Sequence, residues 1–184
     1  VDAAMVDGAS ILMTMFYAFK ASGFWLDERE SNALDGAAHF YDTYECADQK
    51  FLAVGSIEPQ FYSVLLEKLE ISDLKFQDQH NKELWPELKS IMKDRIKEKT
   101  RDEWAKIFEG SDACVAPVLS LSEAPEHNHM KARNSFVEVD GITQPAPAPR
   151  FSNTTPNIKH SSVKAGENND EICSKYNLDR SCFS

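Results

Sequence analysis

One carboxylate, Glu58, ends an apolar, strand-like run in the stretch FLAVGSIEPQFY and stands directly before Pro59. A helix that begins at this proline has free N–H groups and the positive end of its dipole in the first turn, so an acid there can cap it and stay ionised. The same position, at the end of a strand, also suits a carboxylate that acts in a catalytic cleft. The local sequence therefore allows two roles for Glu58, a helix cap or a preorganised catalytic group, and the cap is the commoner.

The histidines offer weaker chemistry. His127 and His129 lie two residues apart, a spacing that does not place two side chains on one helix face, and a zinc site needs more ligands than this pair. We therefore predict no metal site. His39 and His80 have no such neighbour in the sequence, and we expect both to be surface or packing residues.

The cysteines match neither a zinc spacing nor a C-x-x-C redox motif, and the chain is too long and too poor in cysteine for a disulfide scaffold. We expect reduced thiols at all four positions, Cys46, Cys114, Cys173 and Cys182. With seven glycines, the sequence contains no glycine-rich phosphate loop. No serine–histidine–aspartate or cysteine–histidine order can be assigned.

Glu58 is expected to lie between a β-hairpin and a helix. Two strand-like runs, HFYDTYEC and KFLAVGSI, are separated by ADQ, which predicts the hairpin. Pro59 suits the first turn of a helix, and the apolar residues after it recur at three- and four-residue spacing. The residues on this apolar face are Tyr62, Leu65, Leu66 and Leu69.

Further helices are expected on both sides of this unit. Residues 2–22 carry apolar side chains at helical spacing and predict a core helix. A second amphipathic pattern covers residues 84–96, with lysines on its other face. In TRDEWAKIFEG, Thr100 and Glu103 form a candidate capping box and Gly110 closes the helix.

The rest of the chain is predicted to contain short elements and extended segments. ACVAPVLSL and SFVEV indicate strands, and Ser120 and Glu123 suggest a helix cap between them. The prolines from Gly141 to Pro156 favour a linker along a surface, and the tail has room for one short helix. The middle of the chain, about residues 39–126, is therefore expected to be a compact α+β unit.

Charge and hydropathy exclude two kinds of partner. The net charge of −10 argues against a nucleic-acid partner, which would require a basic surface. The longest uncharged run near the start, Gly8 to Phe19, is too short to span a bilayer. The start also lacks a basic region and a cleavage site, so we predict no signal peptide and no membrane partner.

Several longer stretches carry a family resemblance when they are taken in order. They are VDAAMVDGAS at the start, LDGAAHFYDTYECADQKFLAVGSIEPQFY at 34–62, EKTRDEWAKIFEGSDACVAPVLSLSEA at 98–124, HMKARNSFVEV at 129–139 and PAPAPRFSNTTP at 145–156. This ordered set resembles the carboxy-terminal half of the α-methylacyl-CoA racemases, in the family III CoA-transferase superfamily. One departure is His39, where the family usually has proline before the Phe-Tyr pair.

The resemblance implies a fold and a division of the chain. The fold class would be α+β: the small domain of a family III CoA-transferase-type fold, a hairpin plus helices, with a leading helix and linker that belong to a Rossmann-like large domain. The division is then the last helix of the large domain, a linker, the small domain, a returning linker and a tail. Their ranges are 1–22, 23–38, 39–126, 127–156 and 157–184.

The resemblance also implies site residues. Glu58 matches the family's small-domain glutamate, which reaches the active site across the dimer interface and joins the hydrogen-bond network around the catalytic histidine. Four further residues match positions that line the acyl-chain pocket, although ordinary core packing would account for apolar side chains at these spacings equally well. They are Met5, Leu34, Tyr41 and Ile57.

The implied reaction inverts the carbon next to the thioester carbonyl of a 2-methylacyl-CoA through an enolate. No cofactor is implied, because coenzyme A is part of the substrate. The histidine and aspartate that transfer the protons lie in the family's first half, and neither is in this sequence. We therefore expect the chain to be inactive alone.

Two alternatives stay open: part of a family III CoA-transferase, and a non-catalytic dimerisation module. Related transferases usually carry a small or amide residue near position 58, so Glu58 favours the racemase. The resemblance also implies an interlocked homodimer that binds an acyl-CoA thioester in a peroxisome or mitochondrion. No targeting signal is visible, and the ending SCFS is not the peroxisomal tripeptide.

Overall fold

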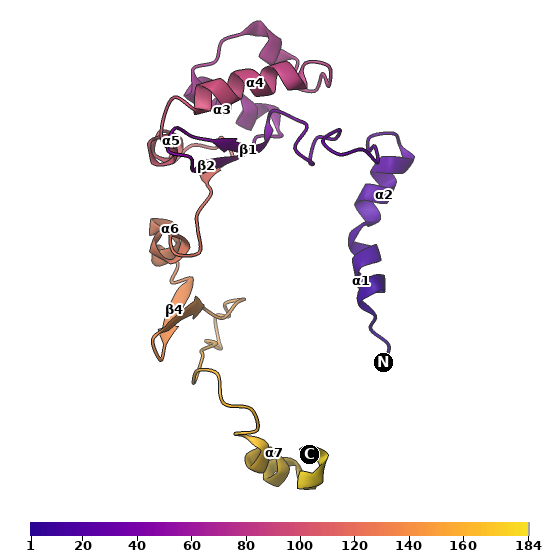
Figure 1. The fold of residues 1–184 in the computed structure, drawn as a ribbon, viewed down its shortest axis with the longest axis vertical. Helices are drawn as coiled ribbons and strands as arrows, with labels where there is room; N and C mark the ends of the chain where they lie inside the picture. The colour runs from indigo at the N-terminus through magenta and orange to yellow at the C-terminus, as the bar shows by residue number, and fades with distance from the viewer. Residues whose placement is uncertain (184) are drawn as a thin grey trace. The chain divides into compact units, whose positions relative to one another are not determined.

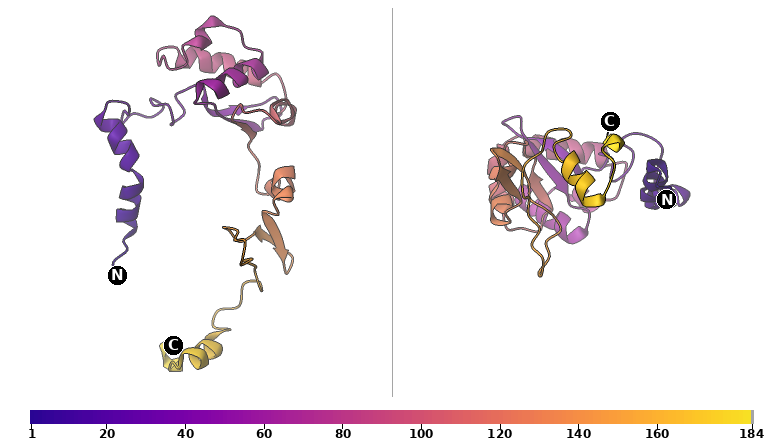
Figure 2. Two further views of the ribbon diagram at one scale, coloured as in Figure 1. Left: turned by 180° about the vertical axis from the view of Figure 1, so that it is seen from behind. Right: turned by 90° about the horizontal axis from the view of Figure 1, so that it is seen from below.

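The computed structural model describes residues 1–183 and contains two compact units, Val1–Val118 and the chain from Leu119 onward. Figures 1 and 2 show the course of the chain through both. The helices of the first unit are α1 (Met5–Leu12), α2 (Thr14–Ala21), α3 (Pro59–Leu69), the 3₁₀ turn η1 (Leu74–Gln77), α4 (Trp85–Ile96) and α5 (Arg101–Phe108).

A three-stranded antiparallel sheet organises the first unit. Its strands are β1 (Tyr41–Glu45), β2 (Phe51–Gly55) and β3 (Val115–Pro117), in the order β1-β2-β3. Tyr44 pairs with Leu52, and Leu52 pairs in turn with Pro117. The predicted hairpin is confirmed, and β3 joins it from a distant part of the sequence.

The core lies between the sheet and the helices α3 and α4, which cover one side of it in Figures 1 and 2. Because side chains alternate along a strand, Tyr44, Leu52 and Val54 share the buried face of the sheet. The apolar face predicted for α3 supplies Leu65 and Leu69 to this core. The other large buried side chains are Phe40, Phe76, Leu88, Met92, Ile96 and Trp104.

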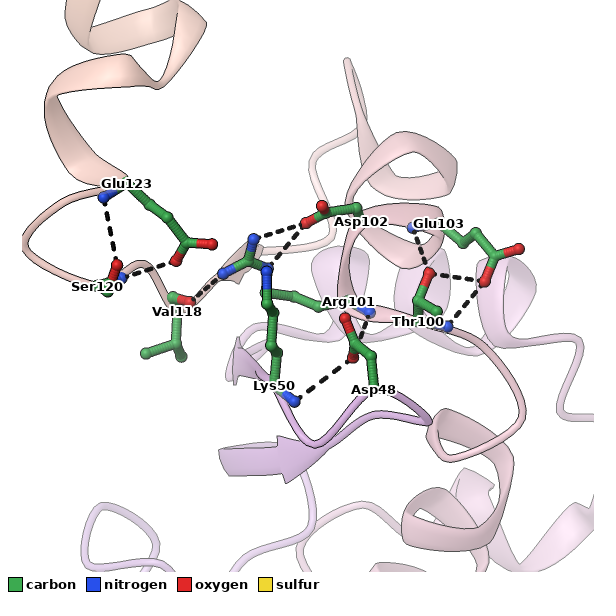
Figure 3. A network of polar contacts seen from close by, with 9 residues as sticks. All are labelled: Asp48, Lys50, Thr100, Arg101, Asp102, Glu103, Val118, Ser120 and Glu123. Carbon is green, nitrogen blue, oxygen red and sulfur yellow. Dashed lines mark hydrogen bonds and ion pairs between the residues drawn. The ribbon is translucent and has the colours of Figure 1, made fainter.

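The start of α5 is fixed by a capping box, as its sequence predicts. Thr100 Oγ1 accepts the Glu103 N–H at 3.3 Å, and the Glu103 carboxylate accepts the Thr100 N–H at 2.8 Å (Figure 3). The Asp48 carboxylate, in the hairpin turn, accepts the Arg101 N–H at 3.1 Å. These bonds satisfy N–H groups that the first turn of a helix leaves without partners, and they join the hairpin to α5.

The prediction of one helix over residues 2–22 is wrong in one respect: the chain forms α1 and α2, with a break at Met13. The hydroxyl of Thr14 donates to the Ile11 carbonyl at 2.6 Å, and such back-bonding competes with the helical ladder and bends it. No residue of either helix is buried within this chain.

The second unit is built from short elements: η2 (Ala124–Glu126), α6 (Asn128–Ala132), β4 (Phe136–Val139), β5 (Ile142–Pro145), α7 (Asn169–Tyr176) and η3 (Arg180–Phe183). Ser120 and Glu123 exchange the predicted capping bonds at 3.0 and 3.2 Å, but a 3₁₀ turn follows them (Figure 3).

The prediction of an extended linker from Gly141 to Pro156 is wrong over its first residues, which form part of a hairpin. Asp140 and Gly141 both have positive φ angles, the geometry of a tight hairpin turn, and β5 pairs with β4 through Val139 and Ile142. The short tail helix is confirmed by α7. Within residues 1–183, no helix has both the length and the hydropathy needed to cross a bilayer.

Candidate functional site

The face of the sheet opposite the core carries a groove. The pairing register places Thr43, Ala53 and Ala116 side by side on this face, and their small side chains form its floor. The groove has a volume of about 470 Å³. Its lining residues are Leu34, Asp35, Gly36, Tyr41, Asp42, Thr43, Ala53, Val54, Gly55, Cys114 and Ala116.

Tyr41 and Leu34 are the large side chains of the groove. Tyr41 pairs with Gly55 across the hairpin, and two of its ring carbons lie 3.8 and 3.9 Å from the position that a Cβ on Gly55 would take. The ring therefore lies over a position without a side chain, which keeps the floor open beside it. An aromatic and an aliphatic side chain around a floor of small residues make a surface suited to an apolar ligand group.

The loop that carries Leu34 is held by internal hydrogen bonds. The Asp35 carboxylate accepts the backbone N–H of Asn32 at 2.9 Å and the Asn32 side-chain amide at 2.7 Å. The Asn32 amide bonds in turn to both the N–H and the carbonyl of Leu26, at 2.8 and 3.0 Å. Burial raises the pKa of Asp35, but the hydrogen bonds from Asn32, Ser31 and Ala37 outweigh it and lower the pKa overall.

The segment that follows β2 is pinned to the body of the unit. The Gln79 side-chain amide donates to the carbonyls of Ser56 and Ile57, at 3.0 Å each. The Ser56 hydroxyl donates to the Ala113 carbonyl at 2.5 Å, and its N–H donates to the Phe40 carbonyl at 3.0 Å. The backbone that presents Ile57 and the next residue is therefore fixed, while the Ile57 side chain is exposed.

Glu58 occupies the N-cap position of α3, but its carboxylate makes no capping hydrogen bond, so the predicted side-chain cap is wrong. Favoured N-cap residues have short side chains that reach the N–H groups of the first turn, and Glu has an extra methylene. Pro59, the first helical residue, has no N–H to offer. The Glu58 side chain is exposed and remains available for other contacts.

The Cys114 thiol, which lines the groove, lies in a negative electrostatic environment. Burial raises the pKa of the Cys114 thiol, and the negative charges of Glu58 and Asp112 raise it further. Glu58 itself is not among the residues that line the groove; it follows β2 in the chain, three residues after the groove residue Gly55.

The structure thus brings together some of the predicted site residues. Leu34 and Tyr41 line the same groove, and Ile57 and Glu58 follow the strand that forms its floor. Met5 lies on α1, is exposed, and does not line the groove. Whether these residues bind substrate stays a prediction.

The sequence interpretation did not single out Cys114, Ala53, Gly55 and Ala116 as groove residues. Alternation along β2 was a usable signal for two of them, because Ala53 and Gly55 face away from the buried Leu52 and Val54. The position of Cys114 in the groove could not be predicted from the sequence, since it depends on how β3 pairs with β2.

None of the histidines is among the residues that line the groove. His39 is a buried packing residue whose ring meets Phe40 and Phe76 edge-on, and His127 accepts the His129 N–H at 3.3 Å at the start of α6. Among residues 1–183, no group of three or more His, Cys, Asp or Glu side chains gathers in a metal-binding arrangement.

A second hollow, about 570 Å³, lies within the second unit and is lined by Val137, Phe151 and Ile158 among others. Its one guanidinium, Arg150, donates to the carbonyl of Asn134 at 3.3 Å and to that of Arg133. Arg150 therefore ties the chain after β5 to the end of α6. None of the predicted site residues lines this hollow.

Comparison with known proteins defines the class. Residues 1–169 match CoA-transferase family III, and the chain belongs to this family. It is 41% identical to the mouse α-methylacyl-CoA racemase over 180 residues, which are 96% of this chain and 47% of that protein. The human α-methylacyl-CoA racemase is 39% identical over 98% of this chain and 48% of its own length. The chain therefore spans about half the length of these relatives.

Solved structures support the fold. The chain superposes on Rv3272 from Mycobacterium tuberculosis with a TM-score of 0.66 at 16% identity, covering 91% of this chain and 44% of the other. A CaiB/BaiF family protein from Brucella suis gives a TM-score of 0.64 at 21% identity, over 90% and 44%. At these identities the likeness concerns the fold alone, and it supports the α+β class expected from the sequence.

Proposed function

We propose that this chain is the carboxy-terminal half of a racemase that interconverts the R and S forms of 2-methylacyl-CoA thioesters. The observation that carries the proposal is an apolar groove on the sheet together with an exposed carboxylate on the segment that follows β2, one of the groove's strands. Leu34 and Tyr41 flank a floor of small residues, and Glu58 stands on a fixed backbone with its carboxylate uncommitted to the helix. The identity of about 40% to two racemases over nearly the whole chain supports the same assignment.

The proposed chemistry is proton removal and return. A base breaks the C–H bond next to the thioester carbonyl, the electron pair moves into an enolate, and an acid returns a proton to the opposite face. Stabilising the enolate oxygen and holding the reacting carbon between two groups supply most of the rate. By family resemblance a histidine and an aspartate of the other half transfer the protons, so the 184 residues alone are expected to be inactive.

Glu58 has a supporting role in this proposal. Its carboxylate accepts a hydrogen bond in the network around the catalytic histidine and so orients the imidazole and favours its charged form. The groove holds the acyl chain through Leu34 and Tyr41. Ile57, on the segment after β2, and Met5, on the helix that belongs to the large domain, would add to the acyl-chain surface. Coenzyme A is part of the substrate, and no separate cofactor takes part.

The intact protein would act as an interlocked homodimer, in which the small domain of one subunit completes the site of the other. The location we propose, by family resemblance, is the peroxisome or the mitochondrion. A cross-linking measurement on the intact protein, with one cysteine placed at position 58 and one in the large domain, tests whether the contact forms between subunits.

The direct test uses the intact protein and its Glu58→Gln variant, which keeps the shape of the side chain and removes its charge. Wild-type protein should racemise a single enantiomer of a 2-methylacyl-CoA and incorporate solvent deuterium at the α-carbon. The variant should lose at least about tenfold in both rates, because a catalytic group that is no longer held in place can cost about 10²-fold. Near wild-type deuterium exchange in the variant would show that Glu58 takes no part in the mechanism. Racemisation by the 184-residue chain alone would contradict the assignment of the proton-transferring groups to the other half.

A second candidate function is that of a family III CoA-transferase. It is favoured by a 36% identity over 118 residues to a CaiB/BaiF CoA-transferase family protein of Caenorhabditis elegans. The two activities differ in their products. Transfer of coenzyme A to a labelled free acid, with no inversion of the donor's α-carbon, would select the transferase.

A further inference from the structure

One lysine of α4 reaches the groove from the helical side of the sheet. The Lys89 ammonium donates a hydrogen bond to the Gly36 carbonyl and forms an ion pair with the Asp42 carboxylate. Gly36 belongs to the loop that carries Leu34, and Asp42 belongs to β1 next to Tyr41. Both partners of Lys89 line the groove.

The two partners are brought together at the free edge of the sheet. β1 is an edge strand, and the loop lies beside it: a Cβ on Gly36 would be 3.7 Å from Asp42 Oδ1. Gly36 has a φ of +92°, a conformation that residues with side chains rarely adopt, so the backbone conformation of the loop at this point favours glycine. Asp42 Oδ1 also accepts the Thr43 N–H at 2.7 Å, which leaves the second carboxylate oxygen for Lys89.

This ion pair differs from a solvated surface pair. The side chains of Lys89 and Asp42 are 28% and 24% exposed, whereas those of the neighbouring pair Lys97 and Glu45 are 55% and 37% exposed. Exposed pairs contribute little, because water and salt screen them, while a partly desolvated pair with a further hydrogen bond holds its geometry. The Lys89 contacts therefore act as a fixed clamp between the loop and β1.

The loop is rigid within itself through Asp35 and Asn32, so its position is decided by how it is anchored to the sheet. We propose that Lys89 is a positioning residue for the groove: by holding the Gly36 carbonyl and the Asp42 carboxylate with one ammonium, it fixes Leu34 relative to Tyr41 and thereby sets which acyl chains fit. This inference rests on the proposed function, because it takes the acyl chain of the thioester as the ligand of the groove.

The test compares Lys89→Met, which keeps the apolar stem and removes the three donors, with Lys89→Arg, which keeps the charge. Lys97→Met, at the end of the same helix, is the matched control because it breaks only the exposed pair with Glu45. In the intact protein, KM and kcat are measured for a long-chain and a short-chain 2-methylacyl-CoA. Asp42→Asn provides a second route to the same loss if Lys89→Met folds poorly.

Lys89→Met should raise KM for the long-chain thioester about tenfold, as expected for losing hydrogen bonds to a charged group. kcat should change less than about twofold, and the short-chain thioester should be unaffected, because a positioning role acts on chain binding and leaves the chemistry alone. Lys89→Arg should recover most of the affinity. An equal rise in KM for both thioesters, or no rise for either, would overturn the proposal.

Hydrogen exchange of the 184-residue chain gives a readout that does not depend on activity. In Lys89→Met, the amides of Asn32 and Ala37 should exchange about tenfold faster than in the wild type, while the amides of α3 keep their exchange rates. In the Lys97→Met control, the loop amides should exchange at the wild-type rate. Unchanged amide exchange in the loop of Lys89→Met would show that Lys89 does not hold the loop in place. Faster exchange in the loop together with a wild-type protein that racemises neither thioester would instead contradict the proposed function and leave the clamp in place.

Discussion

Nε2 of His39 lies 2.7 Å from the phenolic oxygen of Tyr62 in the interior of the first unit. His39 has no exposed surface, and its Nδ1 has no hydrogen-bond partner among the described residues. An imidazolium needs two acceptors, so this site suits the neutral ring only. Burial, with a further contribution from His80, lowers the pKa of His39 to about 4.

The first prediction is a loss of stability in mild acid. Unfolded His39 titrates near its ordinary pKa of 6.5 and the folded residue near 4, so protons bind the unfolded chain more tightly. The contribution of neutral His39 to the free energy of unfolding is complete above pH 6.5. As the pH falls toward 4, this free energy decreases by up to about 3 kcal/mol. Urea unfolding of the chain between pH 4.5 and 7.5 measures this slope.

His39→Phe should flatten the slope over that range, because it removes the titrating group and keeps an aromatic ring among Phe40 and Phe76. His160→Gln, at an exposed position, should leave the slope as in the wild type. An unchanged slope in His39→Phe would mean that another group controls the acid response.

The parts of the fold that were predictable are those whose partners are close in sequence or lie in adjacent strands. The hairpin follows from alternation in β1 and β2, and the capping box joins Thr100 to Glu103 three residues away. The strand β5 was missed because prolines dominate the pattern after Ile142, while its pairing depends on a turn with two positive φ angles.

The groove could not be predicted in the same way. Its clamp joins Lys89 to Gly36, 53 residues apart, and in the sequence Lys89 is one of several lysines on a solvated helix face. Resemblance placed Leu34 and Tyr41 in a pocket, but core packing was an equally good account of both. Only the register of β1, β2 and β3 shows that Tyr41 lies on the face opposite the core.

The second prediction concerns the cap of α5. Thr100→Ala removes an oxygen that accepts the Glu103 N–H, and it should lower the free energy of unfolding by about 1 kcal/mol. Thr100→Ser keeps the oxygen and should cost much less. Denaturant unfolding of the three proteins provides the comparison, and equal stability of Thr100→Ala and wild type would argue that the box contributes nothing.

The third prediction fills the groove from its floor. Ala116 is exposed on the open face of the sheet, so Ala116→Leu should leave the unfolding midpoint nearly unchanged. In the intact protein it should lower kcat/KM for a long-chain thioester by at least about tenfold, since a pocket discriminates by about 10–200-fold per methylene. Ala132→Leu, on exposed α6 outside the groove, is the matched control.

A long-chain thioester that reacts equally well with Ala116→Leu and wild type would show that the acyl chain binds elsewhere. A similar loss in Ala132→Leu would point to a general effect of added apolar surface on the assembly.

The last prediction separates the two roles that Glu58 could have from its sequence alone. A side-chain cap would make Glu58→Ala cost about 1 kcal/mol of stability, as at other N-caps. Because the carboxylate makes no capping bond and is exposed, we expect a change below about 0.5 kcal/mol, the range of ordinary surface substitutions. Thermal and urea unfolding of the chain, with Thr100→Ala as the reference for a true cap, measure the difference. A loss as large as that of Thr100→Ala would restore the capping role; a small loss together with the activity defect proposed for Glu58→Gln would mean that this acid serves the reaction and not the helix.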